Sequence, residues 1–436
     1  LKVGKNTFLT KSVSDEVDGA VFAVAQEANP LLPIERYKDT LFLAWGNSWD
    51  INRENPFNTL KIDKDRNKIK IASSNYVEIN PIRGLRVRST FAIDNGTQEY
   101  YEYIPSNIQQ AYRGAFKGRA IHNLDYSNNF QWDNSITYDA SIEKHQISAL
   151  VSTSLSRNTF RYTNVLARDF PINDFSYYNL GSAYDRANFN LGSDKSASSL
   201  ESYLARVNYS FGNKYFATLT GRFDGSSRFA DGHKWGFFPS IGLSWNILNE
   251  EFMKSQQLFD LMKLRLGYGS VGNQSIPNYA FYSLYNPVYS GGSVSFASSG
   301  LRGTPNLKWE KQNQFNIGLD LALFNNRLFL AADYFNIVNS NLLMRRTLST
   351  ISGYNATIEN IGELTNRGVE LAITGVVLDK KDLRWDISVN FSRDKNKITK
   401  LYQGVDAIYN FGGFTGADIQ RTGNFFLGKS VNTIYM

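Results

Sequence analysis

The sequence has no cysteine, only three histidines and no long apolar run, and each of these absences excludes a class of protein. Without cysteine the chain forms neither a disulfide framework nor a thiolate metal site. No uninterrupted apolar stretch approaches the roughly 18 residues that a helical membrane span needs, so helical membrane proteins are excluded. His122, His145 and His233 lack ligand-like spacing, and no GxSxG motif is present. We therefore expect no zinc site, no catalytic triad and no enzymatic activity.

Runs of like charge are also missing. The 47 basic and 40 acidic residues give a net charge of +7, but they are interspersed, with no block of five or six charges of one sign. A scattered positive charge is not the basic patch that binds nucleic acid, so we expect no nucleic-acid partner.

Aromatic residues are abundant instead. The chain contains 30 Phe, 25 Tyr and 7 Trp, which is 14% of its residues, yet its mean hydropathy is only -0.35. A closed β-barrel reconciles these two values, because its strands are apolar on one face only and aromatic girdles border its apolar band. Low hydropathy is therefore compatible with a membrane location.

Period-two alternation is the main pattern in the sequence. In one run the odd positions Leu85, Val87 and Phe91 are apolar while Arg86 and Arg88 lie between them. Similar runs of about ten residues recur along the chain, which is the length of a tilted transmembrane strand. We expect about fourteen strands, each with a lipid face and a lumen face.

The connections between these runs alternate in length. The short turns are Asn80 to Gly84, Ser141 to Lys144, Gly212 to Lys214, Phe324 to Asn326 and Leu378 to Asp382. The long segments are Asn95 to Asn128, Arg157 to Ser199, Val271 to Lys308 and Ser340 to Leu364. Short turns on one side and long loops on the other are typical of outer-membrane barrels. Gly225 to Gly232 is a shorter outer loop, and Asn246 to Leu261 is a longer inner one.

Helical patterning is confined to two places. The inner connection predicts a short amphipathic helix with Asn249 as its cap before Glu250 and Glu251. A second helix is predicted from Val21 to Ala28, ended by Pro30 and Pro33.

Several longer phrases of the sequence occur in the order typical of one protein family. They are Tyr215 to Phe229, Trp235 to Ser240, Leu264 to Gly269 with Gly272 and Asn273, Asn306 to Glu310, Gly318 to Asp320, Asn360 to Leu364 and Asn366 to Glu370; Asn80 to Leu85 and Lys144 with His145 also fit. With these phrases nearly the whole chain resembles the SusC/RagA-type TonB-dependent importers of the bacterial outer membrane.

The resemblance implies an all-β fold, namely a transmembrane antiparallel β-barrel of 22 strands that an N-terminal plug closes. No TonB box or signal peptide precedes Leu1, and the chain stops at Met436, where such a protein would continue into its last strands. We therefore expect residues 1–436 to be part of one outer-membrane barrel domain, with the plug and the last strands outside this chain.

The same resemblance implies a function. Members of this family import oligosaccharides or peptides actively, with energy from TonB and with a SusD-like surface lipoprotein over the barrel mouth. Two alternatives stay open, a passive outer-membrane porin and, from another class, a soluble β-rich adhesin or glycan-processing protein. The sequence does not identify the nutrient.

Two short motifs match cofactor-binding or metal-binding patterns, but the residues around them do not fit either kind of site. Gly267 to Gly272 fits GxGxxG, but it leaves a strand for a long loop instead of opening a helix. Asp63, Asp65 and Asn67 resemble the start of an EF-hand, but Lys68 stands where the loop needs glycine. We expect no cofactor, although loosely bound calcium in the outer loops is compatible with the sequence.

Polar residues at lumen positions are the remaining candidates for a binding site. They either contact a solute or line the barrel interior against water and a plug. The candidates are Arg206, Arg222, Asp224, Asp320, Glu370 and Asp386. Loop tyrosines such as Tyr177, Tyr178, Tyr282 and Tyr285 either stack on a ligand or pack within their own loops.

Overall fold

The protein is built around one large antiparallel sheet. The computed structural model describes residues 1–17, 19, 21–27, 56–108, 110–111, 114–185, 188–290, 292–402, 405–408 and 425–431. Within this part of the chain, thirteen strands are hydrogen-bonded in the order β1-β2-β3-β4-β5-β6-β7-β8-β9-β13-β14-β17-β18. Their bounds are Lys2–Asp15 (β1), Asp63–Ile79 (β2), Leu85–Ile104 (β3), Arg119–Ile142 (β4), His145–Arg168 (β5), Asn190–Phe211 (β6), Tyr215–Ser226 (β7), Trp235–Asn246 (β8), Phe259–Asn273 (β9), Glu310–Leu323 (β13), Leu328–Ser340 (β14), Glu363–Lys380 (β17) and Leu383–Lys400 (β18).

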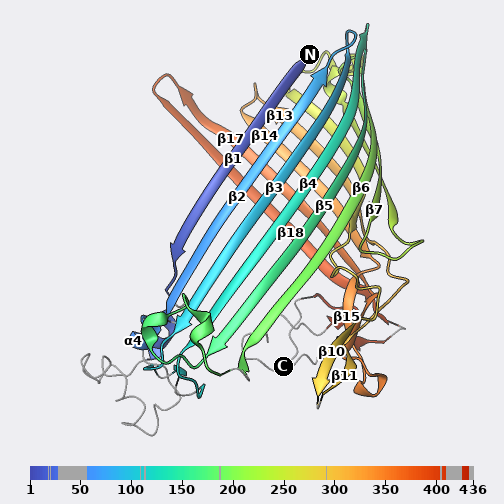
Figure 1. Cartoon of the computed structure of the whole chain (residues 1–436). Helices are drawn as coiled ribbons and strands as arrows, with labels where there is room; N and C mark the ends of the chain where they lie inside the picture. The colour runs from blue at the N-terminus through green and yellow to red at the C-terminus, as the bar shows by residue number, and fades with distance from the viewer. Residues whose placement is uncertain are drawn as a thin grey trace.

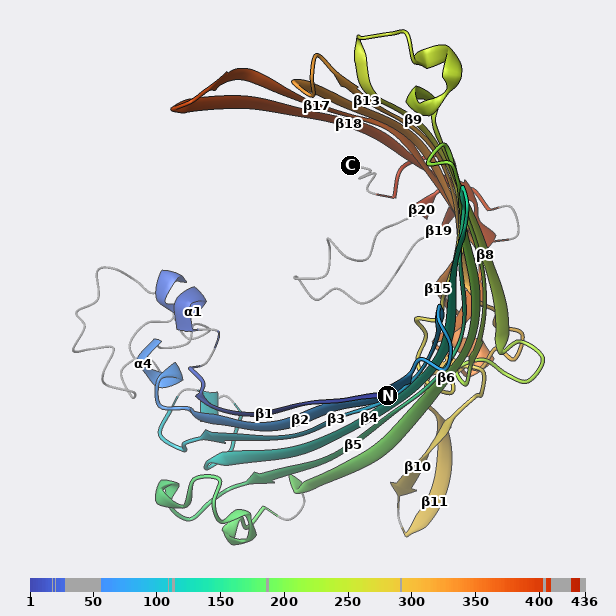
Figure 2. The same ribbon diagram turned by 90° about the horizontal axis from the view of Figure 1, so that it is seen from above.

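The sheet curves into an incomplete cylinder. Seen from above it is an arc, and its edge strands β1 and β18 do not meet (Figure 2). The all-β fold class and the partial antiparallel barrel predicted from the sequence are confirmed. About fourteen strands were expected, and thirteen strands of the described residues form the wall.

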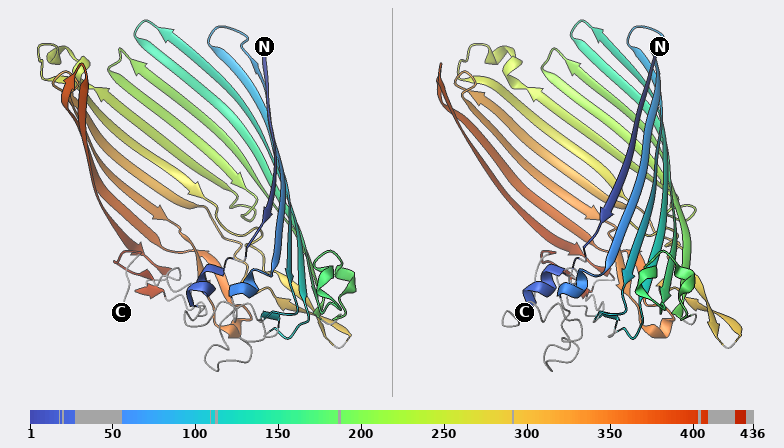
Figure 3. Two further views of the ribbon diagram at one scale, coloured as in Figure 1. Left: turned by 90° about the vertical axis from the view of Figure 1, so that its left-hand side faces the viewer. Right: turned by 60° about the vertical axis from the view of Figure 1, so that its left-hand side comes forward.

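The two ends of the wall differ, as the alternating connections predict. Tight turns join most strands at the end where the N-terminus lies, with one longer helical connection between β8 and β9, whereas the small sheets and the other helices gather at the opposite end (Figures 1 and 3). We call these the inner and the outer end. At the outer end lie the hairpin of β10 (Tyr285–Ser290) and β11 (Ser293–Ser298) and the sheet of β12 (Leu301–Arg302), β16 (Ala356–Asn360) and β15 (Leu343–Thr347).

Strand lengths correct the prediction of about ten residues per run. The strands of the wall contain 12 to 24 residues. In the predicted loop Asn95 to Asn128, β3 continues to Ile104 and β4 begins at Arg119, and in Arg157 to Ser199, β5 continues to Arg168 and β6 begins at Asn190. The Asn and Ser residues that suggested loops lie in strands here, because ladder hydrogen bonds satisfy the backbone whatever the side chains are.

The remaining predicted connections have mixed outcomes. Those at 271–308 and 340–364 are confirmed as long, and the turn expected at Leu378 to Asp382 shrinks because β17 runs to Lys380. The longer inner connection holds two 3₁₀-helices, Ile247–Asn249 and Glu251–Met253, in place of the single short amphipathic helix predicted there. Asn249 is no cap, because it is the last residue of the first of these helices and Glu250 precedes the second; its Nδ2 donates 2.8 Å to the Asn213 carbonyl.

Helices contribute little to the described chain. The predicted N-terminal helix is confirmed as α1 (Val21–Glu27), and its expected end at Ala28, Pro30 and Pro33 lies outside the described residues. Helix α4 (Pro56–Thr59) is a single turn, and small β19 (Ala407–Ile408) pairs with β20 (Phe425–Phe426). No helix in the described ranges is long and apolar enough to cross a membrane.

The register of the sheet sorts the side chains onto two unlike faces. One row across six strands contains Ala149, Val207, Leu219, Ile241, Tyr268 and Phe315. The adjacent row on the opposite face contains Ser148, Asn208, Thr218, Gly242, Gly267 and Asn316. Because successive side chains of a strand point to opposite faces, the first row marks the lipid face and the second the lumen face.

Aromatic side chains border the lipid face at two levels. Trp245 stacks near Tyr215 at the inner end, and Trp235 stacks on Phe223 toward the outer end. Trp235 and Trp245 are separated by ten positions of β8, roughly 34 Å of strand, which projects to about 25 Å when the strand is tilted by about 45°. That height matches the apolar band of an outer-membrane barrel.

Glu250 joins the inner girdle to the turn below it. Its carboxylate accepts hydrogen bonds from the Tyr215 hydroxyl, from Lys214 Nζ at 2.9 Å and from Trp245 Nε1 at 3.1 Å. These donors lower the pKa of Glu250 to about 2. One partly buried carboxylate therefore holds two neighbouring strand ends together.

The assignment of the faces predicts a difference between two adjacent positions on β6. We expect Val207→Arg to lower stability by roughly 2 to 4 kcal/mol, because a cation near the bilayer midplane loses its hydration. Asn208→Arg should cost much less, since Asn208 lies in the polar row and accepts a hydrogen bond from Thr218 Oγ1. Unfolding midpoints of the full-length protein in lipid measure both, and equal losses or the reverse order would contradict the facing.

Glu250 predicts a pH dependence of stability. A carboxylate whose pKa falls on folding stabilises the protein above its unfolded pKa of about 4.5, and this contribution disappears as the pH falls toward 2. Wild type should therefore be more stable than Glu250→Gln at pH 6, and the difference should shrink between about pH 4.5 and pH 2. Midpoints across this range test the prediction, with Glu251→Gln as the control for loss of a neighbouring charge; a pH-independent difference would refute it.

Candidate functional site

The lumen face carries most of the charged residues that the sequence suggests as candidates, and a shared arginine organises one group of them. Arg265 on β9 bonds Asp320 on β13 through Nε (2.8 Å) and Nη2 (2.7 Å). The same guanidinium bonds Asp333 on β14 through Nη1 and Nη2, both at 3.0 Å. Paired donors of this kind fix the carboxylates in position as well as neutralising charge.

Glu370 extends this group by one strand. It lies directly opposite Asp333 in the register of β14 and β17, so three carboxylates and one arginine lie in neighbouring positions. Asp320 and Glu370 are predicted candidates, whereas Arg265 and Asp333 were missed by the sequence reasoning. The signal for Arg265 is its position between Leu264 and Leu266, where alternation places it on the lumen face.

Arg222 and Asp224 form a second, separate pair near the outer end of β7. Arg222 Nε lies 2.8 Å from both Asp224 oxygens, and its Nη2 donates 3.0 Å to Ser202 Oγ. Asp224 is buried despite its charge. Since the ion pair and the hydroxyl satisfy these groups within the wall, they stabilise the strand pair β6-β7 whether or not a solute binds.

The two remaining candidates lie elsewhere on the lumen face. Arg206 donates 3.2 Å to Thr220 Oγ1 across β6 and β7. Asp386 pairs with Arg384 at 3.1 Å, close to the inner turn that precedes β18. The six predicted residues therefore occupy four places along the wall and do not converge on one pocket.

An aromatic cluster closes the outer rim. Phe229, Phe238, Leu307 and Trp309 are buried together, with ring centroids of Phe229 and Trp309 5.3 Å apart. Trp309 Nε1 donates 2.8 Å to the Lys234 carbonyl. Three connections that are distant in sequence thus meet on one small core, which fixes where the outer loops begin.

An asparagine bracket reinforces this rim. Asn360 Oδ1 accepts from the Lys308 backbone N–H at 2.7 Å, and its Nδ2 donates to the carbonyls of Lys308 (2.7 Å) and Asn341 (3.0 Å). A side-chain amide has both donors and acceptors, so it can join two loops in this way. The sequence phrases around Trp309 and Asn360, which are among those that resemble the family, therefore have a structural role in packing at the rim.

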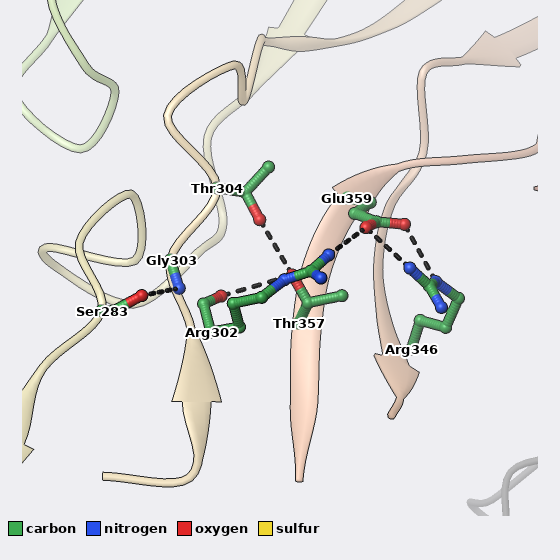
Figure 4. Close-up of polar contacts among 7 residues, drawn as sticks. All are labelled: Ser283, Arg302, Gly303, Thr304, Arg346, Thr357 and Glu359. Carbon is green, nitrogen blue, oxygen red and sulfur yellow. Dashed lines mark hydrogen bonds and ion pairs between the residues drawn. The ribbon is translucent and has the colours of Figure 1, made fainter. Parts of the chain in front are cut away.

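Two arginines share one carboxylate in the small sheet beyond the rim (Figure 4). Arg346 bonds Glu359 through Nε and Nη2, both at 2.9 Å, and Arg302 Nη2 bonds it at 3.2 Å. Thr304 and Thr357 hydroxyls lie 2.9 Å apart beside them, and the Gly303 N–H donates to Ser283 Oγ. This network orders the long connections and leaves one net positive charge near the mouth.

The loop tyrosines divide into packed and exposed ones. Tyr177 is buried, stacks on Tyr101 at 4.9 Å and donates a hydrogen bond to Asp65. It therefore packs against strands β2 and β3. Tyr178 is 82% exposed, and Tyr282 and Tyr285 are also exposed, with the Tyr285 hydroxyl 2.9 Å from that of Tyr354. Only the exposed members are accessible to a ligand or partner.

The motifs set aside in the sequence lie in regular strands. Gly267 to Gly272 belongs to β9, and Asp63, Asp65 and Asn67 belong to β2, so neither forms the loop that its motif requires. Across the described ranges no group of three or more His, Cys, Asp or Glu residues is arranged to hold a metal. Calcium in the outer loops stays a prediction.

The chain is similar in sequence to one known family and to several named proteins. The family profile described as TonB dependent receptor-like, beta-barrel matches residues 27–433. TonB-dependent receptor P3 of Formosa agariphila is 33% identical over 426 residues, which cover 93% of this chain and 41% of that protein. TonB-dependent receptor SusC of Bacteroides thetaiotaomicron is 38% identical over 218 residues, which cover 48% of this chain and 22% of SusC.

A structural comparison agrees on the fold. A solved structure of the RagAB peptide transporter superposes with a TM-score of 0.77 at 23% identity, covering 86% of this chain and 41% of the RagAB chain. The chain thus spans about two fifths of the length of the relatives that it matches over most of its own length.

The shared arginine predicts a stability loss that is independent of transport. We expect Arg265→Met to cost about 1 to 2 kcal/mol, because Asp320 and Asp333 lose their counter-charge; partial exposure of the group reduces the loss. Arg265→Lys should lose less, since charge is kept and only the paired geometry disappears. Urea unfolding of the full-length protein measures both, and a Met variant as stable as wild type would show that Arg265 has no structural role.

Proposed function

Because the chain belongs to the family of TonB dependent receptor-like β-barrels, we propose that it forms much of the wall of an outer-membrane importer. The imported solutes are oligosaccharides or peptides, the energy comes through TonB, and a SusD-like surface lipoprotein covers the outer mouth. The family comprises transport receptors, not enzymes. A plug gates the passage, and the whole protein lies in the outer membrane with many strand crossings.

One observation carries this proposal, namely a single antiparallel wall with an apolar face and a charged lumen face, whose strands from β2 to β18 lie inside the region matched by the family profile. The lumen face has hydrogen-bonding side chains such as Asn208, Thr218 and Asn316 in one row of the sheet, in which Gly242 and Gly267 lie between Thr218 and Asn316. These groups suit hydrated, polar cargo. We propose peptides as well as oligosaccharides as cargo because RagAB, which shares the fold, is a peptide transporter.

The lipoprotein docks on the β10-β11 hairpin in this proposal. The hairpin projects away from the wall at the outer end (Figures 1 and 2). Its register places Tyr285, Pro287, Tyr289, Val294 and Phe296 on one face and Asn286, Val288 and Ser295 on the other. Tyr289 is 76% and Phe296 70% exposed. A two-stranded hairpin is marginally stable alone, so an exposed aromatic face on it favours a protein partner.

Charge also favours a protein surface at this hairpin. No charged residue occurs from Leu266 to Leu301, so the hairpin offers no attraction to an anionic membrane surface. Exposed tyrosine and phenylalanine are common anchors of protein interfaces. We propose that the connections at 169–189 and 274–309 together bury well over roughly 1,000 Å² against the lipoprotein.

The test uses the full-length protein in its own bacterium with the gene deleted and restored. Wild type should restore growth on its nutrient only when TonB is functional, and a surface lipoprotein should co-purify with it in mild detergent. Tyr289→Ser with Phe296→Ser should lower lipoprotein recovery about tenfold, since two interface anchors are removed.

Val288→Ser, on the opposite face of the same hairpin, is the matched control and should leave recovery unchanged. Uptake without TonB would instead indicate a passive porin. A barrel that always purifies without a lipoprotein would overturn the partner, and full recovery of the double variant would overturn the docking assignment alone.

A further inference from the structure

The lipid face of β18 changes its chemistry abruptly along the strand. The positions Trp385, Ile387, Val389 and Phe391 are apolar, and the next three positions on that face are Arg393, Lys395 and Lys397. The lumen positions between them, Asp394 and Asn396, carry no positive charge. The basic residues thus face away from the passage.

Arg367 on β17 adds a fourth cation to the same face. It lies directly opposite Lys395 in the register of β17 and β18. All four side chains are exposed. We call Arg367, Arg393, Lys395 and Lys397 the lipid-side basic patch.

The patch begins where the apolar band ends. Arg393 is ten positions from Leu383, the inner end of β18. Ten residues of strand, roughly 34 Å, project to about 25 Å at a tilt of about 45°, which is the height of the apolar band. Trp235 in the outer aromatic girdle is likewise ten positions from Trp245 on β8, so both spacings match the height of the apolar band.

The patch is uncompensated within the described residues. None of its four members forms an ion pair or a side-chain hydrogen bond there. Glu363, the carboxylate at the outer end of β17, accepts 2.8 Å from Thr399 Oγ1 instead. Like charges directly opposite one another, such as Arg367 and Lys395, destabilise a strand pair, so an anion between them would stabilise the hairpin.

We propose that the lipid-side basic patch binds the phosphate groups of an anionic lipid in the outer leaflet. Arginine and lysine at the headgroup level reach phosphate oxygens while their stems lie along the apolar band. A lipid is favoured over an acidic protein because Phe391 and Val369 continue the apolar surface directly beneath the cations. The site is separate from the passage and independent of the cargo.

The test titrates the full-length protein in mild detergent with diphosphoryl lipid A, with bound lipid counted by native mass spectrometry. Arg393→Gln with Lys395→Gln should weaken binding roughly thirtyfold, since two cations at about 1 kcal/mol each are lost. Arg393→Lys, which keeps the charge, should bind nearly as wild type. Lys380→Gln with Lys381→Gln, at the inner turn of the same hairpin, removes equal charge away from the patch and should have little effect.

A second measurement uses wild type alone, so it does not depend on the variants folding. Dephosphorylated lipid A should bind at least tenfold more weakly than the diphosphoryl form. Equal binding of the two lipids, or undiminished binding by the double Gln variant, would overturn the proposal. Retention of an acidic protein on the patch with no lipid bound would overturn it as well.

Discussion

Backbone hydrogen bonding in a medium without water is the constraint on which this structure depends. Every N–H and C=O within the apolar band must find a partner inside the protein, and a continuous ladder of strands provides one for each. In β4 and β5, which have 24 residues each, the pairing continues without a break from Arg119 and Arg168 to Ile142 and His145. Once that ladder exists, the register decides which side chains meet lipid and which meet the lumen.

The two faces then solve different problems. On the lipid face, aliphatic rows lie between aromatic girdles, and Glu250 holds the polar edges of Tyr215 and Trp245 at the inner boundary. On the lumen face, several charged side chains are paired within the wall, as in the sharing of Arg265 by Asp320 and Asp333. Both arrangements follow from the cost of leaving a polar or charged group without a partner.

The outer end is organised by packing instead of by the ladder. The cluster around Phe229 and Trp309, the bracket of Asn360 and the Arg302–Glu359–Arg346 network each join segments that are far apart in sequence. Rigid loop bases leave the β10-β11 hairpin as a projecting element with an aromatic face.

The sequence by itself determined the fold class, the two faces and the polarity of the wall, because period two and the alternation of short and long connections are local signals. Leu85 and Arg86 were placed on opposite faces from the alternation alone, and α1 was recognised from its helical pattern. The family phrases gave the resemblance that the family profile then established.

Only the tertiary structure decided how far the strands extend and which side chains meet. Polar segments such as 95–104 and 190–199 read as loops, but pairing with a neighbouring strand satisfies their backbone, and single-sequence polarity contains no information about that neighbour. The partnership of Arg265 with Asp320 and Asp333, 55 and 68 positions away, is set by strand order and register. Local sequence specifies the period of a strand, whereas its partners depend on the order and register of the strands in the whole sheet.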